Sequence, residues 1–512
     1  MSNRQWPIVR SRTIIIELHM IIEESPRGAE AAKEPNFSKP FINSFFCLYF
    51  VIGLGLMILT PPFQSADAFA HFDREVGIAS GQLIATTQHG SSGSYLPSGE
   101  VWLEDGFSTI PFNPFARASE YQFHAGMQQN WNTPKVFVKY TTGGNIPFLY
   151  MPQVLGIWIG RLFSPHILVS YYLAELANLI AFVTLARWAL LQFPRRITFP
   201  LGIFLLLPTI ISIAISVNPD SLLLALSLVF VASCFNGYSE NRASGVTTTE
   251  SFQATRRATR SRKRITGSYR IGFISLFLMT LEKPPLVLLS LLLPLADLYT
   301  NFRKYCQRIL VFMGSVSITY ALWALFGAKG AGGPMPPGSF SPSRQLRLIL
   351  TDPLKVVEVT SQTIGKWGWL FWKQLIAGIG WLDVAFPTWF YASLSVVLIL
   401  SIVSTIYRRR SDLTRAIWLL LVLAITASAI SFSLYVFYSP YAASSIYGLQ
   451  GRYYLPLVPP IILVLGLERT RTPLWRITTN TASEYAAITL ISLQLLSATE
   501  YIFVLLSRYW YK

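Results

Sequence analysis

The chain has 512 residues, of which 52% are hydrophobic and only 13% are charged, and its mean hydropathy is +0.43. A water-soluble domain carries about 25% charged residues, so this chain has too little polar surface to coat a soluble particle of its size. That excludes a soluble enzyme, a disulfide-stabilised scaffold and a disordered chain. A net charge of +17 would favour nucleic-acid binding in a soluble protein, but in a membrane protein basic residues gather in cytoplasmic loops and set the orientation.

The first forty residues are polar and charged, and the first long apolar run begins only near Phe41. This order favours a cytoplasmic segment at 1–40 and a retained first span over a cleaved signal peptide. Residues 41–512 are predicted to form one all-α polytopic membrane domain, because several apolar runs reach the roughly 20 residues that cross a bilayer. The clear spans are predicted at Phe41–Thr60, Ile167–Leu191, Phe199–Val217, Ser221–Phe235, Ile309–Phe326, Phe386–Ile406, Ala416–Phe437, Tyr453–Leu467 and Ala486–Leu506.

Two further short spans are predicted between Ile271 and Tyr299, hinged at Glu282-Lys283-Pro284-Pro285. The segment 146–163 decides the topology. Counted as a span, it would place the basic run 256–264 outside, against the rule that positive loops stay in the cytoplasm. Treated as a helix that lies in the membrane interface, with prolines in its first turns, it leaves every basic cluster on one side. We therefore predict about eleven spans with a cytoplasmic N-terminus.

This topology places most Lys and Arg residues in the cytoplasm, including a basic loop at 238–270. The basic run is then a topology anchor in contact with anionic lipid. Nucleic acid is not expected as a partner, because no folded nucleic-acid module accompanies the run. Two large segments, 61–145 and 327–385, lie outside. Since loops on a rigid scaffold commonly carry function, we expect a site at the outer membrane surface.

The first outer segment opens with two prolines, after which Asp67, His71 and Arg74 recur at the spacing of one helix face. Apolar residues follow on the opposite face, which predicts an amphipathic helix resting on the membrane. A partly desolvated carboxylate beside an imidazole can act as a general base. The spacing alone favours a simpler interpretation, in which the polar face is solvated and Asp67 caps the helix.

Further ionisable residues lie at the outer ends of predicted spans, namely Asp220, Lys283, Asp383 and Arg452. Charged groups at membrane depth are costly and are functional candidates, although near the bilayer edge they can reach water at little cost. All four share a face with Asp67 under a topology that was chosen from other residues. Two cations and several carboxylates on one face suit a lipid phosphate and a proton acceptor.

Other residue types carry weaker signals. The three cysteines form no C-x-x-C pair, and the histidines lack metalloprotease spacing, so neither a disulfide framework nor a zinc site is indicated. Five tryptophans cluster around the second outer segment. Stacking on a sugar is one interpretation of them, and an aromatic belt at the membrane interface is the favoured one. They are Trp367, Trp369, Trp372, Trp381 and Trp389.

Six short motifs occur in order along most of the chain. They are the PPFQ-x-x-D-x-x-x-H opening at 61–71, Tyr150-x-Pro152-Gln153, Asn218-Pro219-Asp220, Lys283-Pro284-Pro285, Gly380-Trp381-Leu382-Asp383 and Gly451-Arg452-Tyr453-Tyr454-Leu455-Pro456. In this order they resemble the bacterial family of predicted membrane proteins known as "domain of unknown function 2142", over about residues 44–467. That family is similar to the GT-C fold of polytopic glycosyltransferases, which use polyprenyl-phosphate sugars at the outer membrane face.

The resemblance implies that Asp67 serves as the base or as a metal-linked acid, and that the segment 146–163 lies along the membrane. One departure stands out, because the family pattern reads Pro-Asp-Glu where this chain has Ala66-Asp67-Ala68. The second carboxylate is therefore absent. Asp73 and Glu75 are the acids near enough to replace it, and a divalent cation stays open as a cofactor.

The leading hypothesis is a GT-C-like glycosyltransferase of the bacterial cytoplasmic membrane that works on envelope glycans. Its partners would be membrane lipids, a polyprenyl-phosphate sugar donor and a glycan, lipid or protein acceptor. Asp67 would deprotonate the acceptor hydroxyl with the help of His71. Lys283 and Arg452 would bind the donor phosphate. Further site candidates are Arg74, Lys135, Lys139, Gln153, Asp220, Asp383 and Tyr453.

The alternative is a membrane transporter or an assembly factor for surface polysaccharide, without enzymatic activity. Transporters usually place ionisable residues near the membrane midplane, in broken helices. The predicted span interiors of this chain are nearly free of such residues, and Glu175 in the second span is the exception.

Overall fold

The computed structural model describes residues 36–88, 90–244, 252–294, 301–327, 341–405, 413–467 and 479–511. The chain divides into two units, Met1–Asn36 and Phe37–Lys512, and the description concerns the second. The predicted cytoplasmic segment 1–40 therefore lies almost entirely outside the described residues. The described part is mostly helical.

Six helices are long and apolar enough to cross a membrane, and a bent pair makes a seventh span if it is counted as one. The pair joins α8 (Arg195–Leu205) to α9 (Pro208–Ala214) at 75°. Pro208 causes the break, because proline cannot donate the next helical hydrogen bond. The six are α2 (Lys39–Leu59), α7 (Ile167–Leu190), α10 (Asp220–Ser244), α12 (Phe302–Phe326), α16 (Leu413–Phe437) and α18 (Thr479–Leu505).

The other predicted spans are shorter or irregular helices in the described residues. The hinge falls where it was predicted: α11 (Phe252–Glu282) ends at Glu282, and the 3-10 helix η3 begins directly after Lys283. The predicted count of eleven spans is thus not reproduced by helices of full length. The remaining elements are η3 (Pro284–Leu291), α15 (Thr388–Val403), η5 (Gly451–Leu457) and α17 (Val458–Gly466).

The basic segment 238–270 is helical where the structure describes it, and its position in the cytoplasm stays a prediction. Helix α10 continues to Ser244, and α11 already begins at Phe252. Arg, Ala, Gln and Lys are strong helix formers, and no proline interrupts either arm, so the two helices extend beyond their apolar parts.

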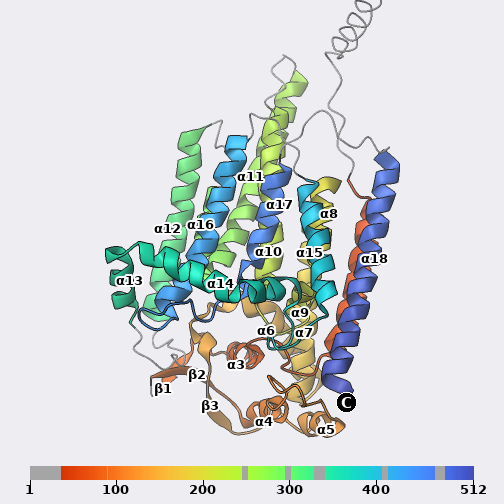
Figure 1. The fold of residues 1–512 in the computed structure, drawn as a ribbon, viewed down its shortest axis with the longest axis vertical. Coiled ribbons are helices and arrows are strands. Elements are labelled where there is room, and N and C mark those ends of the chain that lie inside the picture. The colour runs from red at the N-terminus through yellow and green to blue at the C-terminus, as the bar shows by residue number, and fades with distance from the viewer. Residues whose placement is uncertain are drawn as a thin grey trace, which may run out of the picture. The chain divides into compact units, whose positions relative to one another are not determined.

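The segment 61–145 folds into short helices around a small sheet at one end of the long helices (Figure 1). The strands pair antiparallel in the order β1-β2-β3, with Gly93 of β2 opposite both Thr86 and Lys139. The all-α prediction missed this sheet, because its first two strands, TTQ and SSGSYLP, consist mostly of small polar residues and show little apolar alternation. The elements are α3 (Ala68–Ala79), β1 (Thr86–Gln88), β2 (Ser91–Pro97), α4 (Ser98–Phe107), α5 (Glu120–Met127), β3 (Lys135–Lys139) and η1 (Thr141–Gly144).

Segment 146–163 forms η2 (Pro147–Tyr150) and α6 (Met151–Phe163), with prolines in the first turn of each. Helix α6 packs antiparallel to the first half of α7. The backbones approach closely at two glycines: a Cβ on Gly156 would lie 2.2 Å from the Leu173 carbonyl oxygen, and one on Gly160 would lie 2.6 Å from the Ser170 Cα. At 13 residues, α6 is too short to cross a bilayer. Its position in the membrane interface stays a prediction.

The second large segment contains α13 (Pro342–Thr351) and the long helix α14 (Leu354–Ala377). Figure 1 shows α14 running across the upright helices α16, α17 and α10 instead of along them. It packs against η5 and α9, and its Gln374 carbonyl accepts a hydrogen bond from Thr209 Oγ1 at 2.8 Å. The sequence analysis did not identify this transverse helix.

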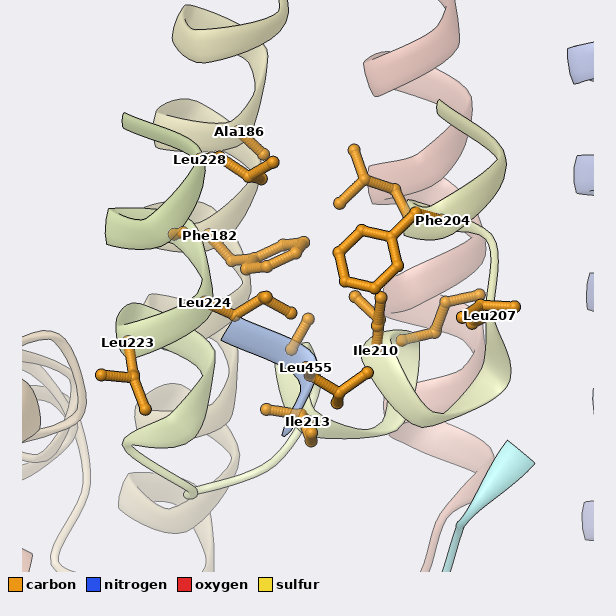
Figure 2. Close-up of a cluster of buried hydrophobic side chains, with 14 of the residues drawn as sticks. Phe182, Ala186, Phe204, Leu207, Ile210, Ile213, Leu223, Leu224, Leu228 and Leu455 are labelled. Atoms are coloured by element: carbon orange, nitrogen blue, oxygen red, sulfur yellow. The ribbon is translucent and has the colours of Figure 1, made fainter. Parts of the chain in front are cut away.

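Buried apolar side chains from α7, α8, α9, α10 and η5 meet in one cluster (Figure 2). The bend between α8 and α9 lets both arms contribute apolar side chains to this cluster. The residues labelled there are Phe182, Ala186, Phe204, Leu207, Ile210, Ile213, Leu223, Leu224, Leu228 and Leu455.

Candidate functional site

Asp67 stands at the N-cap position of α3 in the left-handed backbone region, with φ +63°. Asp tolerates this conformation better than most residues. Its side chain does not cap the helix. Instead, the carboxylate is paired with the guanidinium of Arg452, 385 residues further along the chain, and 46% of the Asp67 side chain stays exposed.

Arg452 is fixed by the packing of its neighbour Gly451 against α14. A Cβ on Gly451 would lie 1.9 Å from the Phe371 carbonyl oxygen, so glycine is needed for this approach, and its amide donates to Gln374 Oε1 at 2.8 Å. The Arg452 side chain is 5% exposed and donates to Gln450 Oε1 at 2.6 Å. A buried, well-held guanidinium therefore faces an accessible carboxylate.

A second ion pair joins Lys283 in the hinge to Asp220, with 2.7 Å between Nζ and Oδ1. Asn218 accepts a hydrogen bond from the Asp220 amide at 2.9 Å and so caps α10, as Asn prefers at this position. The ring of Tyr453 lies between the two pairs: Lys283 Nζ is 4.9 Å and Arg452 Cζ is 5.6 Å from its centre. The structure thus brings together residues from four distant segments.

His71 adjoins this cluster. Its Nδ1 lies 3.0 Å from the Tyr150 hydroxyl, and the charges of Asp67, Arg452, Asp220 and Lys283 all act on its ring. Burial lowers the pKa of His71 to about 4, so the imidazole is neutral at pH 7.

Sequence reasoning missed the network behind His71. The Asn145 side-chain amide donates to the Tyr150 hydroxyl at 3.0 Å and to Glu282 Oε1 at 2.9 Å. These bonds connect the hinge between α11 and η3 to the segment 61–145. The signal available was an acid directly before Lys283, which we treated only as part of the hinge.

A small polar pocket opens beside Arg452. Ser65, Ser212, Ser216 and Asn218 contribute hydroxyl and amide groups to its lining. The Ser65 hydroxyl is buried and has no hydrogen-bond partner among the described residues. The cavity has room for about one water molecule beside the Arg452 guanidinium.

The predicted solvated polar face of α3 is wrong. Arg74 is fully buried, His71 is 8% exposed, and the helix packs against β2, α6 and η1. Arg74 donates to the Leu83 and Asn145 carbonyl oxygens at 2.8 and 3.0 Å and so links α3 to two other parts of the segment 61–145. It takes no part in the ion pairs around Asp67.

Four other candidates form no ion pair or hydrogen bond with Asp67 among the described residues. Asp383 pairs with Arg508 at 3.3 Å and accepts hydrogen bonds from the Phe112 and Trp381 amides. Lys135 and Lys139 are exposed on β3, and the fully buried Gln153 lies on α6.

The residues around Asp67 do not fit a metal ion. The partner of its carboxylate is a guanidinium, and the next residue, Ala68, offers no ligand atom in its side chain. Among the described residues, one group of side chains has the spacing of metal ligands: Asp73, Glu100 and Glu104. Glu75, the other acid named above as a replacement for the absent second carboxylate, is fully buried.

Comparison with known proteins supports the membrane assignment. A family described as "Predicted membrane protein (DUF2142)" matches residues 50–461, well over half of the chain. No curated protein and no solved structure matches it. The apolar helices of the structure agree with a multi-pass protein. The chain therefore belongs to the DUF2142 family of predicted membrane proteins.

Proposed function

We propose that the chain is a GT-C-like glycosyltransferase of the bacterial cytoplasmic membrane, which transfers a sugar from a polyprenyl-phosphate donor to an envelope glycan, lipid or protein. One observation carries the proposal: Arg452 pairs with a half-exposed carboxylate, Asp67, and a second cation from a distant segment, Lys283, lies against the same Tyr453 ring as Arg452. Cations of this kind bind phosphate strongly, and a carboxylate in reach of them can take a proton.

The proposed topology keeps about eleven spans with the N-terminus in the cytoplasm. The short elements α15, η5–α17 and α11–η3 supply the crossings beyond the six or seven full-length ones. The distribution of basic residues supports this orientation, which puts the ion pairs around Arg452 at the outer face.

In the proposed reaction, the donor phosphate competes for Arg452 and Lys283, which are paired with Asp67 and Asp220 in the structure. The freed Asp67 carboxylate accepts the proton of the acceptor hydroxyl while that oxygen attacks the anomeric carbon. The bond from this carbon to the phosphate oxygen breaks, and the phosphate leaves with the electron pair. Arg452 and Lys283 stabilise the charge that develops on it.

His71 supports the candidate base Asp67 without forming an ion pair with its carboxylate. Because its imidazole is neutral at pH 7, it does not hold Asp67 in a second ion pair. Its bond to Tyr150 fixes the ring beside the first turn of α3. His71 is therefore a positioning residue in this mechanism.

The decisive experiment replaces Asp67 by Asn in vesicles that contain the full chain. We expect transfer from radiolabelled polyprenyl-phosphate sugars to fall about 100- to 10,000-fold, because the amide cannot take the proton. The exposed Asp352 gives a matched control, and Asp352→Asn should transfer at the rate of the unchanged chain. Full activity in Asp67→Asn would refute the catalytic role.

The transporter alternative rests on Glu175, which is only 5% exposed in the middle of α7. The charge of Glu175 acts on the buried Glu75 of α3, so these two acids lie close together. Substrate flux that is lost in Glu175→Gln but kept in Asp67→Asn would favour this alternative.

A further inference from the structure

A separate cluster of three acids joins α3 to α4. Asp73 comes from α3, and Glu100 and Glu104 lie one turn apart on one face of α4. One carboxylate oxygen from each residue lies within 4.8 Å of the others. None of the three belongs to the ion pairs around Arg452.

Glu100 is aimed into this cluster. The residue is fully buried, and among the described residues neither of its carboxylate oxygens accepts a hydrogen bond from a donor group. Glu100 is in contact with the carboxyl group of Asp73, and two carboxylates approach each other closely only through a shared proton or a cation. Asp73, at 4% exposed, and Glu104 each have one oxygen without a donor.

No side-chain cation forms an ion pair with the cluster among the described residues. The charge of Arg161 acts on Glu100, but its guanidinium is held elsewhere. It lies 3.9 Å above the centre of the Trp131 ring and donates to Ser80 Oγ at 3.2 Å. Among the described residues, Arg161 is thus a cation whose charge reaches the cluster, but it forms no ion pair with any of the three carboxylates.

The geometry fits one hard cation. Calcium binds carboxylate oxygens at about 2.4 Å, so two ligands on opposite sides of one ion are about 4.8 Å apart. Magnesium needs shorter distances and a stricter octahedron, and zinc favours nitrogen and sulfur ligands. The three oxygens lie at most 4.8 Å apart, which leaves room for one ion between them, and an all-oxygen set without an octahedral arrangement favours calcium over magnesium and zinc.

We propose that Asp73, Glu100 and Glu104 bind one divalent cation, Ca²⁺, which ties α4 to α3. The site does not depend on the proposed sugar transfer. It combines Asp73, one of the acids considered above as a replacement for the absent second carboxylate, with two acids of α4. Because Asp67 opens the same helix, the cation stabilises the element that presents the candidate base.

The test uses the full chain in lipid nanodiscs, stripped with a chelator and titrated with CaCl₂ up to 10 mM. We expect one Ca²⁺ per chain by isotope retention and a rise of several degrees in the midpoint of thermal unfolding, because the ion binds only the folded chain. Glu100→Gln should bind Ca²⁺ at least tenfold more weakly and lose the rise. Glu120→Gln, at a 90% exposed side chain in α5, should keep both.

Equal Ca²⁺ retention in the unchanged chain and in Glu100→Gln would overturn the proposal. The proposal would also be overturned if Ca²⁺ caused no thermal shift and if Glu100→Gln unfolded at a higher midpoint than the unchanged chain in chelator. The acids would then be stabilised by protons that their carboxyl groups share. If Glu100→Gln does not fold, Glu104→Gln takes its place, since Glu104 is only partly buried. Its expected loss of Ca²⁺ binding is the same.

Discussion

Two Arg–Asp pairs connect distant parts of this chain, and they differ in how many hydrogen bonds the carboxylate accepts and in how exposed it is. Asp383 is 13% exposed and accepts from Arg508 and from two backbone amides, so its oxygens are occupied. Asp67 is 46% exposed, and only Arg452 hydrogen-bonds to its carboxylate among the described residues. The same residue types therefore form a buried, fully hydrogen-bonded contact at Asp383 and an accessible ion pair at Asp67.

The surroundings sharpen this difference. Arg508 also donates to the Ala116 and Ile110 carbonyl oxygens and so fastens the end of the last helix to the segment 61–145. Arg452 adjoins a polar pocket and a second cation, Lys283, across the ring of Tyr453. Removing Arg508 should damage the fold, whereas removing Arg452 should damage ligand binding.

The largest effect is expected for Arg452→Gln. Binding of polyprenyl phosphate to the full chain in nanodiscs should weaken about 100-fold, because a charge-assisted hydrogen bond contributes about 1.5–3 kcal/mol and the opposing Asp67 charge is no longer balanced. Arg452→Lys should recover part of the affinity but not the bidentate contact. Unchanged phosphate binding in Arg452→Gln, measured by equilibrium retention, would make this pair structural, like the one at Asp383.

The next effect concerns stability. Arg508→Leu leaves the Asp383 carboxylate buried without its cation, and removing one partner of a buried pair costs about 3–5 kcal/mol. The midpoint of thermal unfolding in detergent, followed by tryptophan fluorescence, should fall by several degrees, while phosphate binding per folded molecule stays the same. Lys355→Gln breaks an exposed pair with Glu358 and should leave the midpoint unchanged. Weaker phosphate binding in folded Arg508→Leu would contradict the distinction.

Part of this arrangement follows from the sequence. Apolar run length predicted α2 and α7 to within two residues at each end, and the proline pair after Lys283 located the hinge. The convergence of Asp67, Asp220, Lys283 and Arg452 followed from topology, because residues at the same ends of crossing helices must meet at one face.

The rest depends on contacts that no local pattern encodes. Asp383 and Asp220 share one sequence signal, an acid at the outer end of a predicted span. Only the structure shows that the Asp383 carboxylate pairs with Arg508, near the end of the chain. The transverse helix α14 has apolar and aromatic residues all along it, so its sequence resembles that of a belt or a span. The polar face of α3 looked solvated because its covering elements, β2 and η1, lacked a recognisable pattern.

The smallest expected effect is a pH dependence that separates His71 from the exposed histidine His124. Burial lowers the pKa of His71 to about 4 from an ordinary value of 6.5, so between these values the unfolded chain binds more protons than the folded one. Stability therefore falls as the pH drops from 6.5 toward 4. In chelator, His71→Gln should show a weaker loss of thermal stability over this window than the unchanged chain. His124→Gln, at a 75% exposed side chain, should follow the unchanged chain, and identical curves for all three proteins would show that His71 is not held neutral beside Asp67.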